Sequence, residues 1–164
     1  MARNPEYSPQ GEALGGYIFV CNNVTMPDCF RRRIFGLPAR NRESVSEIRP
    51  GMPIFLYNFN TGLLYGIFEA VSFGGMNIDP LAWPDPNFPG RSAYPAQVRV
   101  RCRVIRPPLN DSIFRLIVGV PIRYRRRLSV TQALNLLDIY EYLHCYCVAL
   151  AREVIAAAIA LPDI

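Results

Sequence analysis

Short apolar runs separated by turn-forming residues are the main hydrophobic pattern of this chain. Residues 17–21 are continuously apolar and predict a buried strand, which ends at Asn22 and Asn23. Residues 53–59 predict a second strand and residues 63–71 a third, because the Asn and Gly residues between them are typical of a hairpin turn. These three segments are expected to pair in one sheet.

One helix is predicted between the first two strands. Thr25, with Asp28 three residues later, indicates a capping box for a helix over residues 26–34. Gly36 is expected to adopt a left-handed conformation that ends this helix, and Pro38 to prevent its continuation.

A long loop and an alternating strand follow the hairpin. Residues 72–94 are rich in Gly, Asn, Asp and Pro, and a loop of this length in a small domain is often functional. Residues 96–105 then alternate between apolar and polar side chains, which indicates a half-buried strand. Its apolar face comprises Ala96, Val98, Val100, Cys102 and Val104, and its polar face Gln97, Arg99, Arg101 and Arg103.

The last third of the chain contains two further candidate elements. Residues 113–120 are apolar and fit either a strand or a helix. Ser129 and Gln132 form a second capping-box pattern, followed by apolar residues at helical spacing as far as Tyr140. A helix is therefore predicted from Ser129 onward.

The pattern divides the chain into a tail, a domain and a C-terminal segment. Residues 1–14 are a polar tail without an apolar leader, residues 15–143 form the domain, and residues 144–164 form an apolar helix or tail. Arg152 and Glu153 split this last segment into pieces too short to cross a bilayer, so no membrane partner is expected.

Length and composition place the domain in the α+β class. The 164 residues, of which 51% are hydrophobic and 19% charged, suit one domain with a packed core. The order strand, helix, hairpin, long loop, strand and terminal helix predicts a small curved mixed sheet or open β-barrel with packed helices.

All eighteen basic residues are arginine, and the net charge is +5. Guanidinium groups pair bidentately with phosphate, so an anionic partner such as single-stranded RNA fits this surface. Arg99, Arg101 and Arg103 would lie about 7 Å apart along one strand face, a spacing that suits contacts with backbone phosphates. The alternative is a solvated face paired with neighbouring acids such as Glu69.

The five cysteines suggest reduced thiols rather than disulfides, and hence an intracellular protein of the cytoplasm, the nucleus or both. Cys21 and Cys102 fall in apolar strand patterns and are expected in the core. Cys145 and Cys147, next to His144, lack the spacing of a zinc site, so neither a metal nor a cofactor is expected.

Four motifs in fixed order resemble the plant development and cell death (DCD) domain. They are Gly-Tyr-Ile-Phe-Val-Cys-Asn-Asn at 16–23, Phe-Gly-Leu-Pro at 35–38, Gly-Gly-Met-Asn-Ile-Asp-Pro at 74–80 and Pro-Ala-Gln-Val at 95–98. The motif residues expected to have structural roles are Phe35, Gly36, Pro38, Asn77, Asp79, Pro95 and Gln97.

The DCD family is in turn similar to the YTH and EVE domains, which implies a PUA-like fold. YTH domains bind a methylated adenine in an aromatic cage, and this resemblance implies a ligand-binding site at Asn22, Asn23, Leu37 and Trp83. Leu37 stands where YTH domains have one of their tryptophans, which implies weak or no preference for methylated over plain adenine. The alternatives are that Asn22 only builds a turn and that Trp83 only anchors the loop.

Two functions remain open at this point, neither of them enzymatic. His144 is the single histidine, and no Ser or Cys has a recognisable catalytic partner. The chain is expected to be a binding module, either for RNA or a modified base, or for other proteins. The DCD resemblance implies a role in plant development, stress response and programmed cell death.

Overall fold

A computed structural model describes residues 13–119 and 126–160. Residues 1–12 of the expected polar tail, and residues 161–164, lie outside the described part of the chain. The elements in chain order are β1 (Leu14–Cys21), α1 (Met26–Arg32), β2 (Ile34–Leu37), η1 (Ala39–Asn41), α2 (Arg42–Ser46), β3 (Pro53–Asn58), β4 (Leu63–Ala70), β5 (Gly75–Met76), β6 (Ala96–Cys102), β7 (Leu109–Asn110), α3 (Asp111–Val118), β8 (Arg127–Ser129) and α4 (Val130–Ala160).

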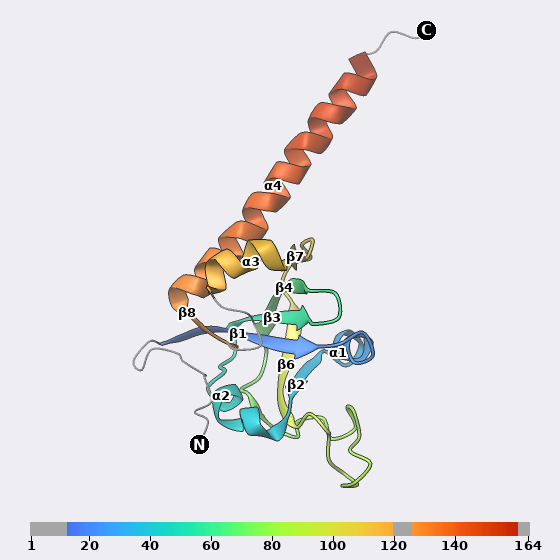
Figure 1. Ribbon diagram of the computed structural model, residues 1–164, viewed down its shortest axis with the longest axis vertical. Helices are drawn as coiled ribbons and strands as arrows, with labels where there is room; N and C mark the ends of the chain where they lie inside the picture. Colours follow the sequence, from blue (N-terminus) through green and yellow to red (C-terminus); the bar gives the residue numbers. More distant parts are fainter. Residues whose placement is uncertain (1–12, 120–125, 161–164) are drawn as a thin grey trace.

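The strands form one curled mixed sheet in the order β2-β6-β4-β3-β1-β8 (Figure 1). β1 and β3 pair in parallel, and the other pairs are antiparallel. The short strands β5 and β7 pair with β6 and β4. This arrangement confirms the predicted α+β class and the curved mixed sheet.

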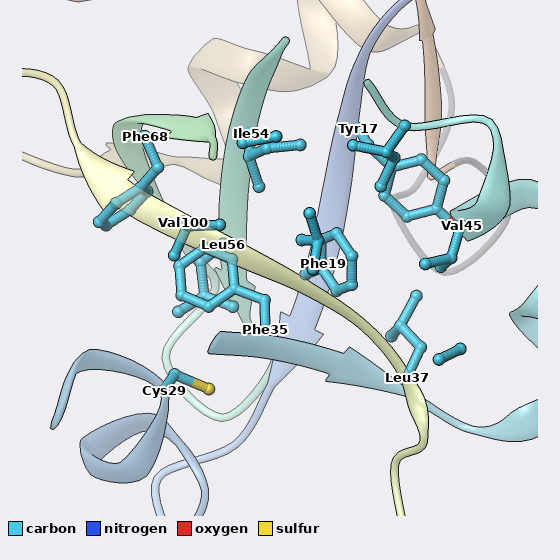
Figure 2. Close-up of a cluster of buried hydrophobic side chains, with 14 of the residues drawn as sticks. Tyr17, Phe19, Cys29, Phe35, Leu37, Val45, Ile54, Leu56, Phe68 and Val100 are labelled. Atoms are coloured by element: carbon cyan, nitrogen blue, oxygen red, sulfur yellow. The ribbon is translucent and has the colours of Figure 1, made fainter. Parts of the chain in front are cut away.

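Alternation along the buried strands creates two hydrophobic clusters. Tyr17 and Phe19 of β1 point into the curl of the sheet, where they pack with Phe35 and Leu56 (Figure 2). Ile18, on the opposite face, belongs to the cluster beneath α3 and α4. Both faces of β1 are covered by other parts of the domain, which explains why residues 17–21 are continuously apolar.

The predicted end of the first helix is wrong. α1 ends at Arg32, and Arg33, with φ of 53°, is its left-handed C-cap. Gly36 lies in β2, paired with Gln97 of β6, and its φ is not positive. Pairing between distant strands overrides the local stop signal, so residues 34–37 are a strand.

The start of α1 also differs from the prediction. Thr25 makes no side-chain capping bond and forms no box with Asp28. The Asn22 side chain instead accepts hydrogen bonds from the main-chain N–H groups of Val24 and Thr25, at 2.9 and 2.8 Å. A turn built by Asn22 therefore precedes the helix.

Strand β6 confirms the predicted apolar face as far as Val100 but not beyond it. Cys102 is exposed, so its predicted core position is wrong. Gln97 is fully buried although it shares the face of the arginines, because the segment after β5 covers it. Arg99 and Arg101 remain exposed.

The predicted helix from Ser129 onward is confirmed at its start. Ser129 N–H donates to Gln132 Oε1 at 3.0 Å, and Gln132 N–H donates to Ser129 Oγ at 3.1 Å, which is the predicted capping box. The apolar residues 113–118 prove to be helical, within α3.

Helix α4 runs without interruption across the predicted boundary at residues 143–144 and projects from the body of the domain (Figure 1). Taken as a whole, α4 is long and apolar enough to cross a membrane by length and composition alone, although the apolar pieces on either side of Arg152 and Glu153 are short. Arg152 and Glu153 interrupt this stretch, and the absence of a membrane partner stays a prediction.

Candidate functional site

A pocket of about 200 Å³ opens where the end of β1, strand β2 and the long loop meet. Asn22, Leu37 and Trp83 all line it, so the structure brings together the three residues that the sequence placed in one cleft. The remaining lining residues are Val20, Cys21, Thr25, Cys29, Gly36, Pro38, Arg40, Phe59, Tyr94 and Arg126. Their role in binding stays a prediction.

The side-chain oxygen of Asn22 stabilises the turn that follows β1. Its Oδ1 accepts from two main-chain N–H groups and from the Thr25 hydroxyl at 3.1 Å. Its Nδ2 makes no hydrogen bond to any described residue, which leaves both N–H donors of this residue of the pocket lining available. The turn-building interpretation of Asn22 is thus confirmed without excluding contact with a ligand.

Trp83 is held in an unfavourable local conformation. Its φ of 48° lies in the left-handed region, which costs a non-glycine residue about 1–3 kcal/mol. Its indole Nε1 is buried without a hydrogen-bond acceptor in the described chain. Tyr94 packs against the indole with ring centroids 5.8 Å apart and planes at 82°. Such strain concentrates at functional sites, where the surrounding structure maintains it.

The close approach of Trp83 to strand β2 explains the glycine at position 36. A Cβ built on Gly36 would lie 2.6 Å from the Tyr94 carbonyl oxygen and 3.1 Å from Trp83 Cζ3. Any side chain at Gly36 would therefore displace the pocket wall. Phe35 is fully buried in the core, and Pro38 follows β2 and lines the pocket.

Four of the pocket residues that the sequence did not assign to this site add aromatic surface or charge to it. Phe59 and Tyr94 supply further aromatic surface, and Arg40 and Arg126 supply positive charge. The position of Tyr94, immediately before the Pro-Ala-Gln-Val motif, was the only signal for any of them.

Asn23 does not line the pocket, although it was predicted as a ligand contact. Its side-chain Oδ1 accepts from Asn58 Nδ2 at 2.9 Å, and its main-chain N–H donates to Asn60 Oδ1 at 2.8 Å. Asn23 therefore ties the end of β1 to the β3–β4 turn.

The third motif, at residues 74–80, and the fourth, at residues 95–98, hold the long loop in place. Asn77, with φ of 57°, donates its N–H to the Pro95 carbonyl at 2.6 Å, and its Oδ1 accepts from Ser92 N–H at 3.0 Å. Asp79 forms an ion pair with Arg32 at 3.1 Å. These bonds fix both ends of the segment that carries Trp83.

Arg99, Arg101 and Arg103, the predicted row of phosphate contacts, form an arginine stripe whose charge is partly neutralised. Arg101 forms an ion pair with Glu69, its neighbour across the β4–β6 pair. Arg99 and Arg103 are exposed and have no acidic partner among the described residues. The stripe therefore keeps two unpaired cations, whose contact with phosphates stays a prediction.

The thiols fall into two environments. Burial raises the pKa of the Cys21 thiol to about 12 and also raises the pKa of Cys29. Cys102, Cys145 and Cys147 are exposed. The described residues contain no group of three or more His, Cys, Asp or Glu side chains that could hold a metal ion.

The fold of this domain is similar to that of solved YTH domains. The structure of the YTH domain-containing protein mmi1 with RNA matches with a TM-score of 0.60 at 11% identity, over 82% of this chain and 85% of that one. The Pho92 YTH domain in complex with m6A matches with a TM-score of 0.56 at 14% identity, over 82% and 87%.

The chain belongs to the development and cell death domain family, whose model matches residues 15–140. It is 54% identical over 138 residues to the DCD domain-containing protein NRP-A of Glycine max, covering 82% of this chain and 37% of that protein. It is 52% identical over 139 residues to the B2 protein of Daucus carota, covering 83% and 67%. The chain thus spans little more than a third of the soybean protein's length.

Proposed function

We propose that this DCD domain is a non-enzymatic module that binds single-stranded RNA by taking one base into the pocket lined by Asn22, Leu37 and Trp83. The observation that carries the proposal is the convergence of these three side chains on one pocket beside Arg40 and Arg126. An RNA base gains stacking energy on the indole of Trp83. The guanidinium groups of Arg40 and Arg126 attract the phosphates on either side of that base.

The size of the pocket supports a single base rather than a larger ligand. Its volume of about 200 Å³ is below the range of roughly 300–1,000 Å³ typical of sites for drug-sized molecules. The unused Asn22 Nδ2 can donate to a ring nitrogen or carbonyl oxygen on the base edge. Solved YTH structures with RNA and with m6A, reported above, make this ligand class the natural one to test.

The orientation of the aromatic rings supports stacking on one face only. Trp83 and Tyr94 are nearly perpendicular, so they do not form a parallel sandwich around one base. Leu37 offers an aliphatic surface. A second stacking face is worth about 1–3 kcal/mol per base, and without it we expect at most a few-fold preference for methylated over plain adenine.

Two readouts on the same titration test the proposal. Anisotropy of a labelled single-stranded oligoribonucleotide reports binding anywhere on the surface, whereas the emission of Trp83, the single tryptophan, reports occupancy of the pocket. Asn22→Asp keeps the Oδ1 acceptor of the turn but removes the amide donor, so it should weaken RNA binding with little effect on unfolding. Binding without a change in Trp83 emission would place RNA elsewhere.

Salt dependence tests the arginine stripe separately. Each lost phosphate contact should lower the slope of log affinity against log salt by about 0.7 for a single strand. Arg99→Ala and Arg103→Ala should each have this effect, and Arg115→Ala on α3, whose side chain pairs with Asp111, is the control. Absence of RNA binding at low salt would leave protein–protein interaction as the function to pursue.

The biological setting follows from the family and is part of the proposal. We place the domain inside the cell, where exposed Cys102, Cys145 and Cys147 stay reduced. Roles in development, stress response and programmed cell death would then reflect which RNA, or which protein, the longer relatives bring to this domain.

A further inference from the structure

A second and larger pocket also borders helix α1. Its volume is about 510 Å³, and Cys29 of α1 is the one residue it shares with the smaller pocket. It is lined by Cys29, Phe30, Arg33, Phe35, Tyr65, Gly66, Phe68, Val100, Arg101, Cys102, Ile105 and Arg106. Phe35 belongs to the Phe-Gly-Leu-Pro motif and Arg101 to the alternating strand, but the sequence did not predict a pocket at either residue.

Three aromatic rings form the body of this pocket. Phe30, 41% exposed, stacks on Phe68 with centroids 6.0 Å apart and meets Tyr65 edge-on at 6.2 Å. Apolar side chains such as Val100 and Ile105 extend the surface. An exposed aromatic in a pocket of this size is typical of a site for a small organic molecule.

The charges around the pocket leave one cation unpaired. Arg101 pairs with Glu69, and Arg106 holds Glu141 of α4 with bonds of 3.1 and 3.0 Å. The Arg106 hydrogen bonds lower the pKa of Glu141, so this second pair is charged at neutral pH. Three guanidinium groups thus face two carboxylates, a net of +1.

Arg33 is the unpaired cation, and its backbone holds it at the pocket. It is the left-handed C-cap of α1, with its N–H bonded to the Cys29 carbonyl, and its own carbonyl accepts from Val100 N–H at 3.0 Å. Its side chain has no acidic partner among the described residues. A guanidinium beside an apolar surface selects an anion attached to an apolar body.

We propose that this larger pocket binds an amphipathic organic anion, with its ring or chain among Phe30, Tyr65 and Phe68 and its carboxylate or sulfonate on Arg33. The mostly apolar lining does not suit a phosphodiester strand, which needs repeated cations. The site does not depend on the RNA-binding proposal, because it shares only Cys29 with the smaller pocket and has its own charge.

The test uses a matched pair of probes on the intact chain. Anilinonaphthalene sulfonate supplies an aromatic body with one anion, and phenylnaphthylamine supplies nearly the same rings without the sulfonate. Cys102 lines the pocket and is exposed, so its alkylation, followed by mass spectrometry, reports occupancy. Cys145 and Cys147 on α4 are exposed internal references.

We expect the sulfonate probe to slow alkylation of Cys102 several-fold, with Cys145 and Cys147 unchanged. Arg33→Gln should weaken probe binding about tenfold, the effect of one charge-assisted hydrogen bond. Arg31→Gln, which removes a neighbouring arginine paired with Asp28 outside the pocket, should have no effect.

Three outcomes would overturn the proposal. They are equal protection of all three exposed thiols, equal affinity for the anionic and neutral probes, and equal effects of the Arg33 and Arg31 substitutions. The comparison of probes needs no substitution, so it stands even where a variant folds poorly. RNA titrations of Arg33→Gln should be unchanged, which keeps this site separate from the smaller pocket.

Discussion

The side-chain amide of Gln97 forms two hydrogen bonds with the main chain of Asp79. Gln97 Oε1 accepts from the Asp79 N–H at 2.7 Å, and Gln97 Nε2 donates to the Asp79 carbonyl at 3.2 Å. Gln97 thereby acts as a substitute for a neighbouring strand and joins the fourth motif to the third. Because Asp79 also pairs with Arg32, the loop that carries Trp83 is fixed to both β6 and α1.

Gln97→Leu should destabilise the domain by about 2 kcal/mol or more, because two main-chain groups of Asp79 lose their partners. The emission of Trp83 should also shift, since its loop loses an anchor. Urea unfolding measures the first effect and fluorescence the second. Arg99→Gln, at an exposed position of the same strand, should stay within about 0.5 kcal/mol of wild type. Equal stability of the two variants would contradict a structural role for the Gln97 amide.

Gly36→Ala should cost about 1–3 kcal/mol and perturb Trp83, because the new Cβ would overlap the Tyr94 carbonyl. Gly75→Ala is the matched control: its Cβ would meet only Ile78, at 3.7 Å, and its φ is not positive. Thermal unfolding and Trp83 emission follow both variants. A Gly36→Ala protein with unchanged melting and emission would remove close approach as the reason for this glycine.

Native alkylation should modify three of the five cysteines. Burial raises the pKa of Cys21 to about 12, so its thiol stays protonated and unreactive between pH 7 and 9, and Cys29 should behave alike. Mass spectrometry after timed iodoacetamide treatment gives the pattern, and treatment in urea should reveal all five. Fast labelling of Cys21 in the folded protein would mean that the packing of β1 against α1 opens readily.

Removal of residues 145–164 should leave the melting temperature nearly unchanged, because the described residues from 145 onward are all exposed. The truncated chain should also be less prone to association, since an apolar helix surface is lost. Tyr140→Phe is the contrasting change: its hydroxyl donates to the Leu64 carbonyl at 2.6 Å in the core. Loss of that bond should cost about 1 kcal/mol. Thermal denaturation and light scattering compare the two, and a large loss of stability on truncation would show that the distal half of α4 is covered.

Some local hydrogen bonds were predictable from the sequence. The Ser129–Gln132 capping box forms between residues three positions apart as predicted, whereas the Thr25–Asp28 pattern of the same spacing forms no such box. The strand at residues 17–21 and the hairpin after β3 were predictable for a similar reason, because apolar periodicity and turn residues act over a few positions. The grouping of Asn22, Leu37 and Trp83 came from the family resemblance rather than from spacing.

The tertiary structure decided the features that depend on which distant segments meet. Gly36 looked like a helix stop, yet β2 pairs with β6, and the glycine makes room for Trp83 and Tyr94. Gln97 looked like a surface residue, yet the folded loop buries it and uses its amide. The larger pocket combines α1, β4 and β6, and no single segment encodes it. The sequence by itself determined the family and those local elements whose short-range patterns no distant pairing overrode. The sites required the fold, because their geometry arises from contacts between segments far apart in the chain.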